Sequence, residues 1–102
     1  MKIAIPLFGK MISPRFDVAP KIGLYSIEKG TIAHYKEILC EEKWDGLDRI
    51  FKLKELDVDT LICGRLPEYL NDILNNEGIK IFHRFTGNSK EALKRFLKCR
   101  KT

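Results

Sequence analysis

The chain alternates between short apolar runs and longer amphipathic stretches, and this pattern predicts a mixture of strands and helices. Short apolar runs bounded by turn residues are typical of buried strands. Longer stretches whose apolar residues recur every three or four positions are typical of helices packed on one side. We therefore predict five strands, at residues 2–7, 22–28, 32–39, 60–63 and 79–82, and three helices, at 44–56, between 67 and 78, and from 88 onwards.

Glycine, proline and asparagine mark the ends of several of these elements. Gly30 separates the second and third strands, and a short turn containing Gly predicts an antiparallel hairpin. Pro67 suits the first turn of the second helix, and Gly78 suits a left-handed cap at its end. Asn88, with Glu91 three residues on, resembles a capping box at the start of the last helix.

The apolar residues of the three helices define the faces that we expect in the core. They recur at helical spacing: Trp44, Leu47, Ile50 and Phe51 in the first helix, Tyr69, Leu70, Ile73 and Leu74 in the second, and Leu93, Phe96 and Leu97 in the last. We interpret Trp44 and Phe51 as core residues rather than as ligand contacts.

The order of elements also predicts how the strands pair. Strands that alternate with helices in the second half of the chain require right-handed crossovers and a largely parallel sheet. The most economical sheet has the order 3-2-1-4-5, with the second strand antiparallel. Its switch point lies between the first and fourth strands, where open α/β sheets tend to bind ligands. The 9–20 loop and the 63–67 segment meet there, and His83 and Arg84 lie on the same rim.

Composition places the chain among globular proteins. Its 102 residues predict a single domain spanning 1–102. No apolar stretch is long enough for a signal peptide or a membrane span, so we expect a cytoplasmic protein without a membrane partner. The three cysteines are far apart and match neither a disulfide framework nor a zinc pattern.

Two arginines lie in the segments that are predicted to meet at the switch point, in the crevice between the first and fourth strands. Arg15 offers a planar fork of donors to a carboxylate, a phosphate or an anionic cluster. A local ion pair with Asp17 that orders the loop is an equally good interpretation of the same residue, and the sequence leaves both open. Arg65 precedes a helix amino terminus, which favours anions, although an isolated arginine in a turn is more often solvated.

Cys63 and His83 are the candidate metal ligands. Cys63 ends a central strand near the crevice, and its thiolate would be a soft ligand for iron or copper. A cysteine in this position is more often a small buried apolar residue. His83 follows the fifth strand and could bind a metal through a neutral imidazole, but a surface histidine beside Arg84 is the commoner case.

Three stretches resemble a known family. They are Met-Lys-Ile-Ala-Ile-Pro at 1–6, Ile-Ser-Pro-Arg-Phe-Asp-Val-Ala at 12–19, and Asn-Asn-Glu-Gly-Ile-Lys-Ile at 75–81 together with Ser-Lys-Glu-Ala-Leu at 89–93. Together they are similar to the dinitrogenase iron–molybdenum cofactor biosynthesis family, whose small domains bind or carry nitrogenase cofactor precursors. The resemblance implies a ribonuclease-H-like α/β fold, a three-layer α/β/α arrangement with a mixed five-stranded sheet.

The loop at residues 9–20, called the first loop from here on, departs from the pattern of that family. Its members often have Ser-Pro-His-Phe-Gly, in which the histidine is the suspected cluster ligand, whereas this chain has Ser-Pro-Arg-Phe-Asp. Arginine stays protonated and has no lone pair for a metal. Combining the resemblance with the crevice, we expect the cofactor-binding residues to be Ser13, Arg15, Phe16, Asp17, Gly64 and Arg65. Phe16 could also pin the loop to the sheet, which is the commoner role for such a residue.

These observations are consistent with two functions. The first is a non-catalytic carrier of an iron–molybdenum or iron–sulfur cluster, or of another small anionic ligand, with a cluster-donor or cluster-acceptor protein as its partner. The second is an adaptor that binds an acidic protein or nucleic acid through the basic residues Lys94, Arg95, Lys98, Arg100 and Lys101. We expect nucleic acid not to be the partner, because no aromatic residues alternate with these cations along the last helix. A nuclease would need converging carboxylates, which the pattern does not provide.

Overall fold

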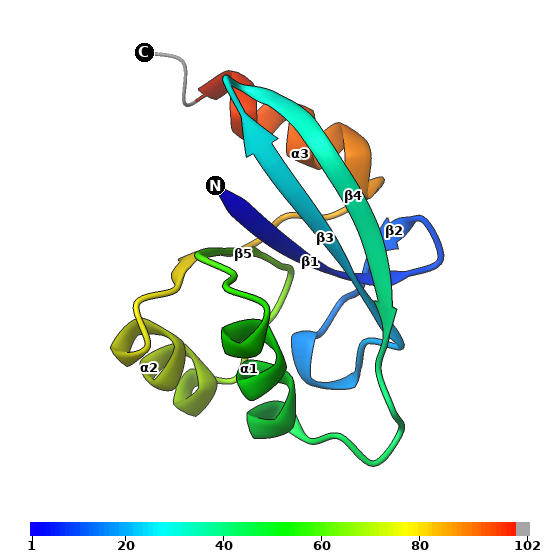
Figure 1. Ribbon diagram of the computed structural model, residues 1–102. Coiled ribbons are helices and arrows are strands. Elements are labelled where there is room, and N and C mark those ends of the chain that lie inside the picture. The colour runs from blue at the N-terminus through cyan, green and yellow to red at the C-terminus, as the bar shows by residue number, and fades with distance from the viewer. Residues whose placement is uncertain (100–102) are drawn as a thin grey trace.

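The computed structural model describes residues 1–99 of the chain. Figure 1 shows a twisted sheet with helices packed on it. The elements in order are β1 (Lys2–Phe8), β2 (Met11–Ile12), the 3-10 helix η1 (Phe16–Val18), β3 (Lys21–Glu28), β4 (Thr31–Leu39), α1 (Gly46–Glu55), β5 (Thr60–Ile62), α2 (Glu68–Asn76), β6 (Lys80–Phe82) and α3 (Ser89–Cys99).

The sheet has the strand order β4-β3-β1-β5-β6, which confirms the predicted order. β1 pairs antiparallel with β3 and parallel with β5, and β5 pairs parallel with β6. The described residues contain six strands, one more than the five predicted. The additional strand is β2, which folds back on the end of β1 and pairs with it. Two paired residues are too few to give a recognisable pattern of alternation in the sequence.

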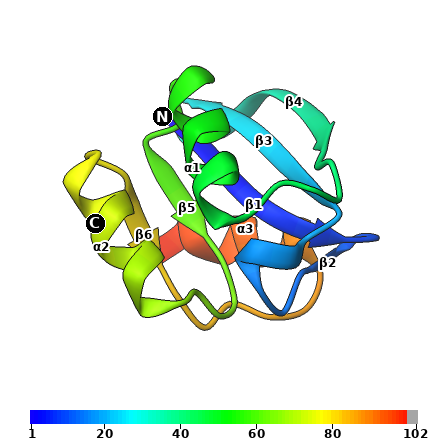
Figure 2. The same cartoon turned by 90° about the horizontal axis from the view of Figure 1, so that it is seen from below.

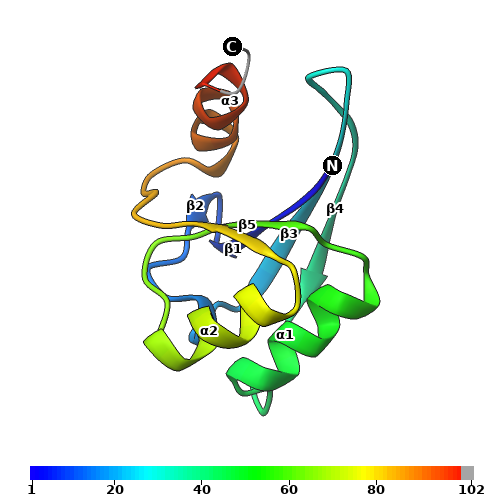
Figure 3. The same ribbon diagram turned by 90° about the vertical axis from the view of Figure 1, so that its left-hand side faces the viewer.

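The helices cover both faces of the sheet and make three layers. Figures 2 and 3 show α1 and α2 together on one face and α3 on the other. Successive strand side chains point to opposite faces, so Ile3 and Ile5 of β1 pack in the cluster with α3, and Ala4 packs in the cluster with α1 and α2. This is the ribonuclease-H-like arrangement that the resemblance implied.

Capping residues fix where the helices begin. Asp45 precedes α1, and its carboxylate accepts from the Asp48 backbone N–H while the Asp48 carboxylate accepts from the Asp45 N–H. This reciprocal pair satisfies two free backbone donors and starts α1 two residues later than predicted. The Asn88 side chain accepts from the Glu91 N–H, as its position indicated. Gly78 has the expected positive φ of 78° after α2.

The predicted core face of the first two helices was partly wrong. Phe51 is 62% exposed and Tyr69 is 57% exposed, and Leu47 also faces solvent. Ile50 is buried as predicted, and Gly46, Arg49 and Leu53 complete the buried face of α1. The sequence pattern missed this face because a glycine and an arginine occupy two of its positions. Leu70, Leu74, Leu93 and Phe96 are buried as predicted. Within residues 1–99, no helix has the length and apolar character needed to cross a membrane.

Candidate anion-binding site

Three connecting segments meet at the carboxyl ends of β1, β5 and β6. The Arg65 N–H donates to the Pro14 carbonyl at 2.9 Å, and the Phe16 N–H donates to the Arg65 carbonyl at 3.1 Å. The Arg84 N–H donates in turn to the Gly64 carbonyl at 3.2 Å. Figure 2 shows these segments side by side at the lower edge of the view. The predicted meeting of the first loop with the segment after β5 is therefore present.

Gly64 lies where these segments approach most closely. A Cβ atom at this position would lie 3.0 Å from the Pro14 carbonyl oxygen and 3.3 Å from the Ser13 carbonyl oxygen. Both neighbours are backbone atoms, which cannot rotate away as a side chain can. Only glycine lets the first loop pack directly on the end of β5.

An open cavity of about 550 Å³ lies where the three segments meet, and we call it the arginine notch. Its volume is within the range of small-ligand sites. The residues that line it are Ile12, Pro14, Arg15, Gly64, Arg65, Arg84, Phe85 and Thr86. A second open hollow on the other side of Arg84 is lined by Gly64, Arg65, Leu66, His83 and Arg84. None of these lining residues is acidic, so the surface around Gly64 is strongly cationic.

The three arginines of the notch differ in their partners. Arg15 forms a two-pronged ion pair with Asp17, with its Nε 3.0 Å from one carboxylate oxygen and its Nη2 2.8 Å from the other. The local pairing left open by the sequence is therefore present. Arg65 and Arg84 make no ion pair with any described residue. Their charges remain available to an anion.

Arg84 has a backbone conformation that is unusual for its residue type. Its φ is 65°, in the left-handed region that residues with a Cβ adopt at a cost. Strained residues of this kind concentrate at functional sites. The sequence placed Arg84 on the rim but gave no sign of this geometry, and it did not identify Arg84 or Phe85 as ligand contacts.

Two of the expected binding residues face the interior. The Phe16 side chain is fully buried in the core beneath the first loop, and Ser13 is 2% exposed. The Ser13 hydroxyl donates to the Arg15 carbonyl at 3.0 Å. These two side chains therefore hold the loop, and Arg15 is the loop residue that presents its side chain to the notch. This assigns Phe16 and Ser13 a positioning role rather than the ligand contact expected from the sequence.

Cys63 is also buried, in the cluster between the sheet and the first two helices. Burial raises the pKa of its thiol to about 12, from an ordinary value of 9.0. The thiolate that would bind a soft metal is therefore scarce at neutral pH. The structure places Cys63 as a core residue next to the notch rather than at its surface.

We expect this burial to protect Cys63 from alkylation. Iodoacetamide at about pH 8 should modify Cys99, which is exposed, and leave Cys63 unmodified until the chain is unfolded, because the thiolate is the reactive species. Peptide mapping by mass spectrometry measures the extent of modification at each cysteine. Equal rates of modification at Cys63 and Cys99 in the folded protein would show that the notch opens into the core.

His83 lies on the exposed rim, where its Nε2 is 3.1 Å from the Asn71 side-chain oxygen of α2. Among residues 1–99, no three histidine, cysteine, aspartate or glutamate side chains gather in a way that could hold a metal ion. The notch is therefore equipped with hydrogen-bond donors and positive charge rather than with a set of coordinating atoms.

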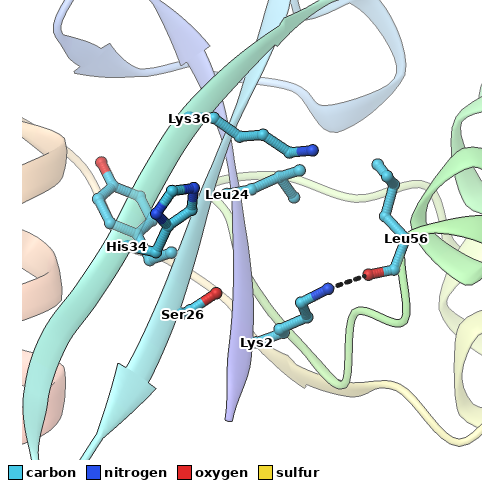
Figure 4. Close-up of a pocket in the computed structure, with 7 residues that line it drawn as sticks. Lys2, Leu24, Ser26, His34, Lys36 and Leu56 are labelled. Carbon is cyan, nitrogen blue, oxygen red and sulfur yellow. Dashed lines mark hydrogen bonds between the residues drawn. The ribbon is translucent and has the colours of Figure 1, made fainter.

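A further cavity lies at the other end of β1, away from the notch. Figure 4 shows Lys2, Ser26, His34 and Lys36 around a hollow of about 120 Å³ beside the end of α1. The Lys2 ammonium donates to the Leu56 carbonyl at 2.9 Å, which caps the last turn of α1. This contact gives Lys2 a structural role.

Comparison with known proteins places these features in a family. A family model described as "Dinitrogenase iron-molybdenum cofactor" matches residues 1–99. No significant match was found among curated proteins.

Solved structures share the fold over nearly the whole chain. The crystal structure of PH0822 has a TM-score of 0.92 at 17% identity, covering 97% of this chain and 90% of the other. A Methanocaldococcus jannaschii protein whose name refers to dinitrogenase has a TM-score of 0.78 at 21% identity, with 97% and 89% covered. A Thermotoga protein whose name refers to NifB has a TM-score of 0.73 at 26% identity, also with 97% and 89% covered.

Proposed function

This chain belongs to the dinitrogenase iron-molybdenum cofactor family, and from that premise we propose that it is a non-catalytic domain that carries an anionic metal cluster or cofactor precursor. The cargo is of iron–molybdenum or iron–sulfur type and sits in the arginine notch. A cluster-donor protein loads it and a cluster-acceptor protein unloads it. The observation that carries the proposal is the backbone-tied junction that gathers Arg15, Arg65 and Arg84 around Gly64.

The chemistry of these residues suggests how the cargo is held. Guanidinium groups donate paired hydrogen bonds to anionic oxygen atoms and attract anions by their charge. Arginine cannot coordinate a metal, and Cys63 is buried. The cargo is therefore bound through its outer anionic atoms and not through bonds from the protein to its metals. Binding of this kind is reversible, which suits a carrier.

The experiment that tests the carrier proposal uses tetrathiomolybdate, a molybdenum dianion with a visible spectrum, and the protein purified without oxygen. Metal analysis and a visible spectrum report what copurifies, and an absorption titration gives the affinity for the added anion. We expect R65A/R84A to bind at least about twentyfold more weakly, because two charge-assisted hydrogen-bonding groups are lost.

A matched control removes the same charge elsewhere. Lys94 and Lys98 lie on the exposed face of α3, so K94A/K98A should change the affinity by less than about twofold. An equal loss in both double variants would show that the anion is attracted only by overall charge. A metal-free protein that takes up no tetrathiomolybdate would overturn the carrier proposal.

The adaptor function remains a second candidate because the exposed face of α3 is basic. Lys94, Arg95 and Lys98 are all exposed. Arg100 and Lys101, the other two members of the predicted cluster, lie outside the described residues. An adaptor of this kind loses its partner in K94A/K98A and retains it in R65A/R84A, the reverse of the pattern expected for the carrier.

Asp17 is expected to limit the affinity of the notch for anions. Its carboxylate occupies the donor edge of the Arg15 guanidinium, so an incoming anion has to compete with it. Exposed ion pairs contribute up to about 1 kcal/mol, so D17N should bind tetrathiomolybdate up to about fivefold more tightly in the same titration. The control D72N makes the same charge change on α2. Weaker binding by D17N would mean that Asp17 orients Arg15 for the cargo.

A further inference from the structure

Another hollow adjoins the arginine notch on the side of α3. It has a volume of about 420 Å³, and we call it the phenylalanine hollow; it is lined by Phe82, Phe85, Arg95, Phe96 and Cys99. Phe85 also lines the notch, so the two cavities lie next to each other. Figure 3 shows the chain leaving β6 and turning back to α3, the path that brings these residues together.

The aromatic rings of the hollow are held in place by one another. Phe82 meets Phe96 at a centroid distance of 4.8 Å and an interplanar angle of 69°. Phe85 meets the same ring at 6.4 Å and 73°. These edge-to-face contacts are favourable, and Phe96 is itself 5% exposed in the core. Phe82 and Phe85 are partly exposed and therefore present fixed apolar surfaces next to the notch.

Arginines lie on both sides of these rings. Arg84 of the notch is next to Phe85 in the chain, and Arg95 projects from α3 on the far side of the hollow. No acidic residue lines either cavity. Phe96, the aromatic residue among the cations of α3, is buried in the core, whereas the partly exposed rings of the hollow come from β6 and the turn that follows it. Cationic and aromatic groups therefore alternate in space although they do not alternate along α3.

We propose that the notch and the phenylalanine hollow together bind a nucleotide unit, with its phosphate at Arg84 and its base against Phe85 and Phe82. Alternating cations and aromatic rings are what single-stranded nucleic acids require, because phosphates and bases alternate along the ligand. The cations here are arginines, whose planar forks match phosphate. An acidic peptide would use the charges but has no need of two rigid rings. Because Arg84 belongs to both sites, the nucleotide and the metal cargo compete.

The test measures fluorescence anisotropy of a labelled oligothymidylate of about twelve nucleotides, a length within the range of site sizes of single-strand-binding domains. We expect binding at low salt, with log affinity falling against log salt at a slope near −2, as for about three phosphate contacts on a single strand. Uridine monophosphate is titrated as a competitor, to distinguish a site for a free nucleotide from a site for a strand. Complete displacement by the mononucleotide identifies a small-ligand site, and affinity that grows with oligonucleotide length identifies a strand site; either supports the proposal.

The variants separate stacking from charge. F85L keeps apolar volume in the hollow but removes the ring, and it should weaken binding at least about fivefold without changing the salt slope. R95A, on the exposed face of α3, should reduce the slope by about 0.7. K43A removes one exposed positive charge from the loop before α1 and should change neither quantity. Melting temperatures confirm that each variant is folded.

Three results would overturn the proposal. The first is no detectable binding of the oligonucleotide at about 0.05 M salt. The second is unchanged affinity in folded F85L together with equal binding of heparin, which has charge but no bases. The third is displacement of the oligonucleotide by polyglutamate as readily as by unlabelled oligonucleotide, which would identify a site for acidic proteins. Uptake of tetrathiomolybdate does not depend on these outcomes, so the carrier function can stand or fall separately.

Discussion

Replacing Gly64 with alanine is expected to cost about 2 kcal/mol of unfolding free energy and to separate the first loop from the end of β5. The added Cβ would lie 3.0 Å from the Pro14 carbonyl oxygen, and forcing an extra carbon into a packed site typically costs about 1–3 kcal/mol. The Arg65–Pro14 and Phe16–Arg65 backbone hydrogen bonds would lengthen. Urea unfolding gives the free energy, and amide chemical shifts at 15, 16 and 65 report the junction.

G78A provides the matched control for G64A. Gly78 has open space around it, but its φ is +78°, so alanine there should cost about 1 kcal/mol through backbone strain alone. The amide shifts of the junction should stay unchanged in that variant. If G64A loses less than about 0.5 kcal/mol, the level of an ordinary surface substitution, and leaves the junction shifts in place, the segments do not need glycine to meet.

The second large effect is expected at Arg49, which clamps η1 onto α1. Its side chain is 3% exposed, and its Nη1 donates to the Ala19 carbonyl at 2.6 Å and to the Phe16 carbonyl at 3.3 Å. It has no carboxylate partner among the described residues. R49M keeps much of the volume but removes both bonds and leaves the buried Ala19 carbonyl without its donor, so it should cost about 3 kcal/mol.

Lys52 offers the comparison for Arg49 on the same helix. Among residues 1–99 its one ion pair is with Glu55, at 3.5 Å and partly exposed, so K52M should cost less than about 1 kcal/mol. Urea unfolding of both variants at neutral pH measures the difference. Hydrogen exchange at Ala19, whose N–H donates to the Phe16 carbonyl, should accelerate in R49M alone. Equal stability of the two variants would mean that Arg49 is not the residue that holds the first loop.

The sequence predicted the sheet well because its strands obey strong local rules. The hairpin turn at Lys29 and Gly30 and the crossovers of the second half leave few possible strand orders, and the predicted order is the observed one. The meeting of the first loop with the Cys63–Pro67 segment followed from that order. The family resemblance added the third layer.

Packing of polar residues against the backbone was not predictable in the same way. Arg49 reads as a surface residue because charged side chains are rarely buried, yet carbonyl groups that are distant in the sequence make its burial possible. Phe51 and Tyr69 follow the expected helical spacing and nevertheless face solvent. The positive φ of Arg84 accompanies a backbone hydrogen bond to Gly64, which lies at the end of a different strand. Each of these features is set by tertiary contacts that no local pattern encodes.

The junction at Gly64 is made almost entirely by main-chain atoms, and this has a consequence for how the site can change. The amides and carbonyls of residues 14, 16, 63, 64, 65, 84 and 85 hold the three loops in register, and the side chains of Arg15, Arg65 and Arg84 take no part in these bonds. Substitutions at 15, 65 and 84 can therefore alter what is bound without disturbing the scaffold. R15H would place an imidazole at the same point of an intact frame, so a single substitution exchanges a permanent positive charge for a nitrogen lone pair.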